Sequence, residues 1–208
     1  MSTTHFPGGI VVAGDINMTG ALSPTKTRTQ LLAITELAAF TVPWTLWRVW
    51  DAMQTNLPGT AATDDLALVG GTWASGSPSL QGIDFKGNST IAYARAQIPL
   101  PWCYADGQTV LLQFHAGMLT TEADDYARLD VVCYETNEEA GISADLCVTG
   151  VQSINSTTLV DINFNITPTN LTAGDLLDVR IHVTGNDALT ATAVIPIIGA
   201  VQLLCDVR

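Results

Sequence analysis

The sequence is poor in charged residues, and poorest in cations. Its 208 residues include 8 Lys or Arg against 20 Asp or Glu, which gives a formal net charge of −12. Charged residues make up 13% of the chain, about half of the share usual in soluble domains. The shortage of cations argues against nucleic-acid binding, which requires basic residues to displace counterions. It argues equally against electrostatic attachment to a membrane.

Long apolar runs and targeting signals are also missing. No stretch approaches the roughly 18 apolar residues of a membrane span. The first residues lack the basic and apolar regions of a signal peptide, so we expect synthesis in a cytoplasm. Reduced cysteines are then favoured over disulfides, although an even number permits two bridges. Their spacing fits no zinc site: Cys103, Cys133, Cys147 and Cys205.

Recognised catalytic motifs are absent as well. The sequence has no Gly-x-Ser-x-Gly elbow, no phosphate-binding glycine loop with a lysine, and no dinucleotide fingerprint. His115 and His182 fall on outward strand positions and could meet to bind a metal, but surface imidazoles are the favoured interpretation. We therefore expect no enzyme activity, no cofactor and no metal site.

What the chain does have is a strong β pattern after residue 70. Threonine occurs 27 times and lysine twice, a balance that favours strands over exposed helices. In 176–183, for example, Val179 and Ile181 share one face while Asp178 and Arg180 share the other. Such alternation recurs in 108–116, 128–135, 158–166, 176–183 and 200–207, and more weakly in 79–85, 89–98 and 144–150. The pattern predicts an all-β, antiparallel two-sheet sandwich of about eight strands over residues 71–208, resembling a jelly roll.

Residues 1–70 form the other predicted part, an irregular and partly helical arm. Apolar spacing favours a helix over 29–39, and three tryptophans spaced three apart would share a stripe if they lay on a helix. The arm is too small for its own core, so it must pack on the β domain, on another copy or on a partner. We expect it to make assembly contacts, as a collar, through Ile10, Val11, Val12, Trp44, Trp47 and Trp50. Packing of the tryptophans against the chain's own β domain is the alternative.

The outward strand positions carry Asn, Thr, Gln and Asp rather than Lys and Glu. Sparse charge of this kind is typical of surface that is buried in an assembly. Together with the dependent arm, it indicates an oligomeric structural protein.

Three segments make the chain similar to virion proteins of tailed bacteriophages. They are GDINMTGALSP at 14–24, the block from AGMLTT at 116–121 to VVCYE at 131–135, and AVQLLCD at 200–206. The family that it resembles most is the capsid decoration (cement) proteins, which have a jelly-roll body. The resemblance implies a homotrimer on the capsid surface of the virion that binds the major capsid protein or another virion protein and stabilises the shell. It also implies that the N-terminal region contacts the shell, and it carries over no catalytic residue.

Three other functions remain open. One is a phage fibre or spike head domain that binds host glycans through Trp102 and Tyr104, although rings that cover the ends of the sandwich are the favoured interpretation. Another is a jelly-roll capsid subunit, which a charge of −12 without a basic arm suits poorly. The third is an enzyme on a β-sandwich, which would require converging acids or bases that the sequence does not identify.

Overall fold

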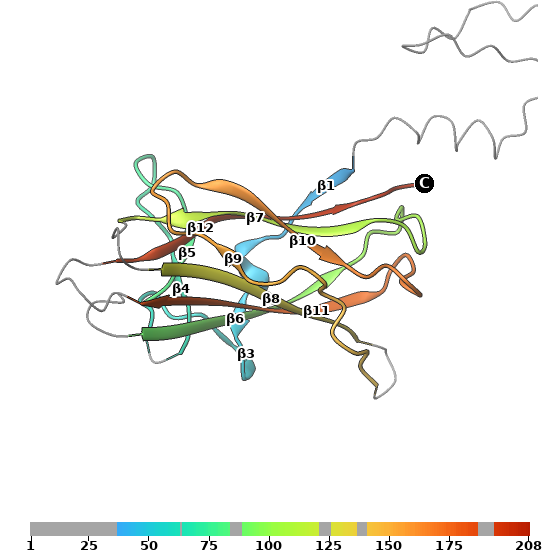
Figure 1. Ribbon diagram of the computed structural model, residues 1–208, viewed down its shortest axis with the longest axis horizontal. Coiled ribbons are helices and arrows are strands. Elements are labelled where there is room, and N and C mark those ends of the chain that lie inside the picture. Colours follow the sequence, from blue (N-terminus) through green and yellow to red (C-terminus); the bar gives the residue numbers. More distant parts are fainter. Residues whose placement is uncertain (1–36, 63, 84–88, 121–125, 137–140, 187–193) are drawn as a thin grey trace, which may run out of the picture. The chain divides into compact units, whose positions relative to one another are not determined.

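The computed structural model describes residues 37–62, 64–83, 89–120, 126–136, 141–186 and 194–208. The chain divides into two units, Met1–Thr35 and Glu36–Arg208, and every described residue belongs to the second. Two β-sheets lie face to face in this unit, as Figure 1 shows. The predicted antiparallel β-sandwich is thus confirmed.

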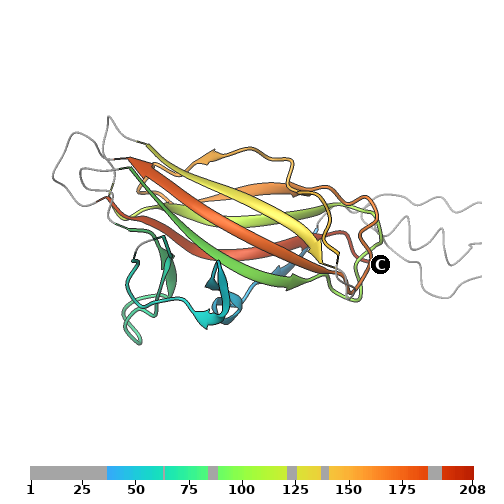
Figure 2. The ribbon, with the colours of Figure 1, turned by 90° about the horizontal axis from the view of Figure 1, so that it is seen from below.

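The described residues form one short 3₁₀ helix, η1 (Trp44–Leu46), and strands that divide between the two sheets. Sheet A has the order β10-β7-β12-β5-β4, with β1 also paired to β12, and sheet B has the order β3-β2-β6-β11-β8-β9. Figure 2 shows β8, β11 and β6 side by side in sheet B. The strands are β1 (Ala38–Thr41), β2 (Arg48–Val49), β3 (Ala52–Asn56), β4 (Ala67–Val69), β5 (Ser79–Gln81), β6 (Ser89–Pro99), β7 (Val110–Met118), β8 (Tyr126–Thr136), β9 (Gln152–Ser153), β10 (Val160–Ile166), β11 (Leu176–Asn186) and β12 (Pro196–Cys205).

No helix in this part of the chain is long and apolar enough to cross a bilayer.

The alternation of apolar and polar residues sets which face of each strand is buried. Strand β11 pairs along its whole length with β6 and with β8, and its Val179 and Ile181 are buried between the sheets. All five strongly alternating segments are strands, and most of their apolar positions point inward. Val160, at the start of β10, is an exception because it is exposed. The weak prediction at 144–150 is wrong, since that segment contributes an isolated bridge at Cys147 rather than a strand.

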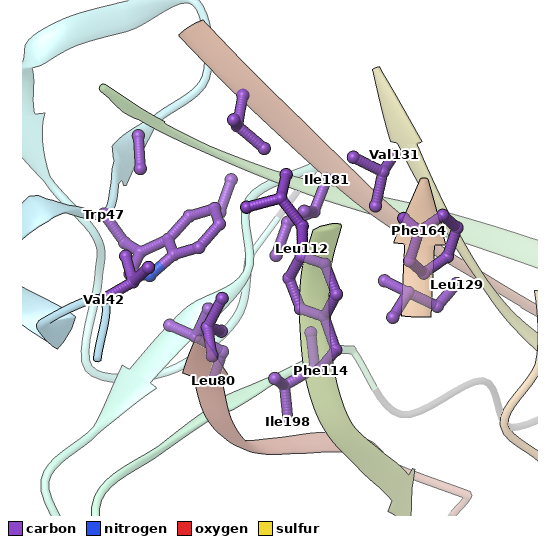
Figure 3. Packing of buried hydrophobic residues seen from close by; sticks show 14 of the residues in the cluster. Val42, Trp47, Leu80, Leu112, Phe114, Leu129, Val131, Phe164, Ile181 and Ile198 are labelled. Carbon is purple, nitrogen blue, oxygen red and sulfur yellow. The ribbon is translucent and has the colours of Figure 1, made fainter. Parts of the chain in front are cut away.

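The core between the sheets is filled by aliphatic and aromatic side chains. Phe114 of β7 and Phe164 of β10 meet edge to face, with ring centroids 5.6 Å apart. Trp47 is 0% exposed and lies with Val42 and Leu80 in the same cluster (Figure 3). A tryptophan from the predicted arm is therefore part of the sandwich core.

The structure corrects the prediction for residues 37–70. Strand β1 pairs with β12 of sheet A, and β2 pairs with β6 of sheet B. These residues gain strand pairing and burial on the β domain, so the sandwich begins before the predicted boundary at residue 70. Residues 29–36 of the predicted helix lie outside the described residues, and its end at Ala38 and Ala39 is strand instead.

The predicted tryptophan stripe is also wrong. The 3₁₀ helix ends at Leu46, and the backbone is extended at Trp47, which caps it. A short helix followed by a strand turns the three rings in different directions. Trp44 is half-buried against the core, Trp47 is inside it, and Trp50 faces away from it.

Candidate functional site

The outer sides of the two sheets differ in charge. Among the strands that the structure describes, those of sheet A contain no Lys or Arg, and their one carboxylate is Asp161. The strands of sheet B carry four arginines: Arg48, Arg95, Arg128 and Arg180. We call the outer side of sheet A the neutral face and the outer side of sheet B the arginine face. In a chain with 8 cations, this segregation makes the arginine face the first candidate site.

Strand register aligns three of the arginines in one row. Arg180 of β11 lies opposite Arg95 of β6, and Arg95 lies opposite Arg48 of β2. Like charges directly opposite each other on neighbouring strands destabilise a sheet. Arg95 is neutralised by Asp178, because its Nε donates to Oδ1 at 2.6 Å and its Nη2 donates to Oδ2. These hydrogen bonds raise the pKa of Arg95 above its ordinary value.

The other two arginines of the row have no carboxylate partner within the described ranges. Arg48 donates through Nη1 to the backbone oxygen of Trp47 at 3.2 Å. Arg180 lies instead over two aromatic rings, with its Cζ 5.7 Å from the Trp50 ring centroid and 5.5 Å from that of Tyr93. Its Nε is buried and has no hydrogen-bond partner in this part of the chain. Arg180 is thus a cation held by π contacts with donor capacity left over.

The two rings beneath Arg180 form an aromatic pair, and hydrogen bonds to Asp64 hold both of its members in place. Trp50 and Tyr93 have centroids 5.0 Å apart. The indole Nε1 of Trp50 donates to Oδ2 of Asp64 at 3.1 Å. The segment that carries Asp64 is itself fixed to β6, because the backbone N–H of Tyr93 donates to the oxygen of Asp64 at 2.6 Å. Burial, followed by the charges of Asp64 and Asp51, raises the pKa of the neighbouring Asp65.

His182 of β11 adds a third ring to this aromatic pair. Its ring centroid is 5.5 Å from that of Tyr93, and its Nε2 lies 3.7 Å from Oδ2 of Asp130. Burial lowers the pKa of His182 and the charge of Arg180 lowers it further, while Asp130 acts in the opposite direction. The imidazole is therefore neutral at pH 7 and adds no third unpaired cation.

A hollow of about 290 Å³ opens beside this cluster, and we call it the Trp50 hollow. Its walls combine apolar surface, hydrogen-bond donors and carboxylates. Such a mixture is what small-ligand sites present: an apolar surface for contact area and a few polar groups for orientation. The lining residues are Trp50, Asp51, Arg95, Tyr134, Ile142, Asp178 and Arg180.

The described residues contain no group of three or more metal-ligating side chains that could hold a metal ion. His115 lies on β7 of sheet A and His182 on β11 of sheet B, so the two histidines do not meet. All four cysteines are free thiols, and Cys133 and Cys205 are buried as expected.

The two predicted glycan contacts, Trp102 and Tyr104, have different environments. Trp102 is 85% exposed, and it packs over Gly174, whose φ of +94° excludes most other residues. Tyr104 is 0% exposed, and its hydroxyl donates to the backbone oxygen of Gln108 at 2.6 Å. The prediction for Tyr104 is wrong, because its ring closes the end of the core and offers no surface to a ligand.

The residues predicted to make assembly contacts also differ in where they lie. Ile10, Val11 and Val12 lie outside the described residues. Trp47 cannot contact another molecule because it is fully buried, so that prediction is wrong. Trp50 lines the hollow on the arginine face. One signal for this site lies in the sequence: in a chain with so few cations, Arg95 and Arg180 both fall on outward strand positions.

No known protein family matches the sequence, and no curated protein matches it. Solved structures of similar fold include the xylan-binding module CBM15 and the CBM22-1 xylan-binding domain from Paenibacillus barcinonensis Xyn10C. The first has a TM-score of 0.40 and 13% identity over 83% of this chain and 99% of its own. The second has a TM-score of 0.39 and 10% identity over 69% of this chain and 82% of its own. The CBM22-1-GH10 modules of Clostridium thermocellum xylanase 10B have a TM-score of 0.43 and 12% identity over 83% of this chain and 29% of their own.

Proposed function

We propose that the chain is a structural protein of a tailed-phage virion, which attaches to the assembled capsid as a homotrimer and stabilises it. The observation that carries the proposal is the neutral face. Its polar side chains pair with each other, as Gln113 Nε2 does with Asn163 Oδ1 at 3.0 Å and His115 with Asp161 at 2.8 Å. A face of this kind can be buried against another copy without burying an unpaired lysine or arginine.

Two tryptophans outside the sheets support the same proposal. Trp73 is 97% exposed, and Trp102 is 85% exposed. Tryptophan is the residue type most enriched among energetically dominant interface contacts. Full exposure of two indoles is costly unless a partner covers them, so these loops are further candidates for contact with the shell.

Attachment would stabilise the capsid by linkage. A protein that binds the assembled shell and not its separated subunits adds RT ln(1 + [L]/Kd) of stability per site, about 2.7 kcal/mol at a hundredfold excess over Kd. A trimer presents the same contact three times, so weak individual contacts give a tight complex. The N-terminal residues, including Ile10, Val11 and Val12, are the proposed shell contact.

The test compares one substitution on each face. Light scattering of the wild-type protein should give one species near three times the 22.0 kDa chain mass. Gln113→Lys places a charge on the neutral face, while Gln97→Lys places the same charge on an exposed position of the arginine face. We expect the first variant to become monomeric and the second to remain trimeric. A monomeric wild type that also fails to sediment with assembled shells contradicts the proposal.

A second candidate function, glycan binding by a fibre or spike head, is favoured by the Trp50 hollow. Aromatic surface beside hydrogen-bonding side chains can hold the apolar and polar sides of a sugar ring together. We expect Trp50→Ala to abolish binding in a glycan screen, with Trp102→Ala as the matched control on a different loop. Retention of binding in Trp50→Ala and loss in Trp102→Ala would move the site to the loop.

A further inference from the structure

We propose that the Trp50 hollow binds a sugar unit that carries a carboxylate, and that Arg180 holds this carboxylate. The inference rests on the glycan-binding candidate and specifies its ligand class. It does not depend on attachment to a capsid.

The row of arginines is the argument for an anionic group. Arg48, Arg95 and Arg180 face outward on three neighbouring strands, and Asp178 neutralises Arg95 alone. Because Asp178 already neutralises the middle arginine, a bound carboxylate would neutralise Arg180, which no described carboxylate pairs with. The row is therefore better explained as a binding feature than as a device for stability.

The stacked position of Arg180 is the argument for where the anion binds. The Cζ atom of its guanidinium lies over the Trp50 and Tyr93 rings, and no described residue accepts a hydrogen bond from the group. Its Nε is buried without a partner among the described residues, and an unsatisfied buried donor is costly. Guanidinium edges pair with carboxylates through two parallel hydrogen bonds, so the carboxylate is the ligand group that fits best.

The other walls of the hollow are the argument for a sugar. Trp50 and Ile142 offer apolar surface, while Asp51 and Tyr134 offer oxygens to hydroxyl groups. Ile142 is 68% exposed, so a ligand would cover an aliphatic side chain that is otherwise in water. The volume of about 290 Å³ is at the lower end of small-ligand sites, which suits one sugar unit rather than a folded partner.

The net charge of −12 does not oppose this inference strongly. Distant acidic groups are screened over a Debye length of about 8 Å at physiological salt. Of the carboxylates on the face, Asp178 is paired with Arg95, Asp64 accepts from the Trp50 indole, and Asp130 lies 3.7 Å from His182. Asp51 is exposed at the hollow and forms no ion pair with Arg180.

The test is a titration of the full-length protein, followed by the NMR signals of the Trp50 indole N–H and the Arg180 Nε–H. The probes are D-glucuronate, its neutral counterpart D-glucose, and acetate. We expect glucuronate to shift both signals and to bind at least about ten-fold more tightly than glucose or acetate, as one charge-assisted hydrogen-bond pair predicts. These signals belong to the wild-type protein, so the test does not depend on any variant folding.

Each of the other outcomes of this titration overturns a different part of the proposal. Equal binding of glucuronate and glucose would leave the glycan candidate standing and overturn the role of Arg180. Equal binding of acetate would show an anion site that does not recognise a sugar, and would overturn the ligand class. No response to any probe would overturn both the inference and the glycan candidate at this hollow.

Variants then locate the contact. We expect Arg180→Gln to weaken glucuronate binding by at least about ten-fold, and Arg180→Lys to weaken it less, because lysine keeps the charge and loses the planar fork. Arg208→Gln is the matched control, since Arg208 pairs with Asp106 away from the arginine face. Equal affinity in Arg180→Gln and wild type would overturn the proposal.

Discussion

At the residue scale, the arginine face leaves two cations without a carboxylate: Arg48 is bonded to a backbone oxygen, and Arg180 lies over aromatic rings. Arg95 is paired with Asp178, and His182 is held neutral by burial. Arg180 remains, supported by the Trp50 and Tyr93 rings rather than by an acid. Cation–π support leaves the donors of the guanidinium free, whereas an ion pair would occupy them.

The coupling of Arg180 to His182 can be measured directly. We expect the native pKa of His182 to lie below its ordinary value of 6.5, mainly because the ring is buried. Arg180→Gln should raise that pKa by removing a nearby positive charge, and Asp130→Asn should lower it by removing a negative one. NMR titration of the His182 ring protons measures all three values.

The lowered pKa of His182 also predicts that the stability of the fold depends on pH. The depressed native pKa means that the unfolded chain binds a proton to His182 more readily than the folded chain does. The contribution of His182 is therefore present above pH 6.5 and is lost as the pH falls through the native pKa. Arg208→Gln should leave the pKa of His182 unchanged, and a native pKa at or above 6.5 would contradict the account.

At the element scale, the segment around Trp47 shows how pairing and burial override helical spacing. Tryptophans three apart would form a stripe on a long helix, but η1 lasts for three residues and the chain then enters β2 beside β6. Trp47 gains complete burial from this arrangement. Its indole Nε1 has no hydrogen-bond partner among the described residues, and this unpaired donor offsets part of the free energy gained by burying the ring.

This arrangement predicts that Trp47 stabilises the fold rather than an interface. Trp47→Ala should lower the free energy of unfolding by about 3–5 kcal/mol, the usual cost of truncating a buried tryptophan. Trp47→Phe should cost less, because it keeps most of the ring and removes the unpaired N–H. Denaturant unfolding measures both changes.

The matched control is Trp73→Ala, which removes an indole that is 97% exposed. It should change stability by less than about 0.5 kcal/mol. A small effect of Trp47→Ala with an unchanged unfolding transition would contradict the assignment of Trp47 to the core.

The five long strands after residue 107, β7, β8, β10, β11 and β12, were predictable because a two-residue period settles both their presence and their inward face. Leu112, Val131 and Ile181 are examples, and each is buried as its alternation requires. Strands β1 to β4 were missed because they are short, at most five residues, and carry little alternation. The site was missed for a different reason: it depends on register, which brings Arg48 and Arg95 together from strands far apart in sequence.

At the scale of the whole molecule, the sandwich separates two kinds of surface. Sheet A presents the neutral face, and sheet B presents the arginine face with its hollow. Because the faces are on opposite sides of one core, a copy of the chain could be bound on one side while a ligand is bound on the other. The proposed assembly and the proposed sugar site are therefore compatible in one protein.

The remaining residues, Met1–Thr35, form the other unit and carry Ile10, Val11 and Val12. Every described strand pairing lies between Ala38 and Cys205, so deletion of 1–35 removes none of these described pairings. We expect the shortened chain to keep its melting temperature within about 4 °C, the shift that 1 kcal/mol produces in a domain of this size.

The same deletion should abolish sedimentation with assembled shells, because the proposed shell contact is in the removed residues. The matched control is the full-length chain with Ile10, Val11 and Val12 changed to serine, which keeps the length and removes the apolar contact. Loss of binding in both proteins with an unchanged melting temperature assigns the N-terminal unit to attachment. A large fall in melting temperature on deletion would instead make residues 1–35 part of the folded body, and binding that survives deletion would place the shell contact on the sandwich itself.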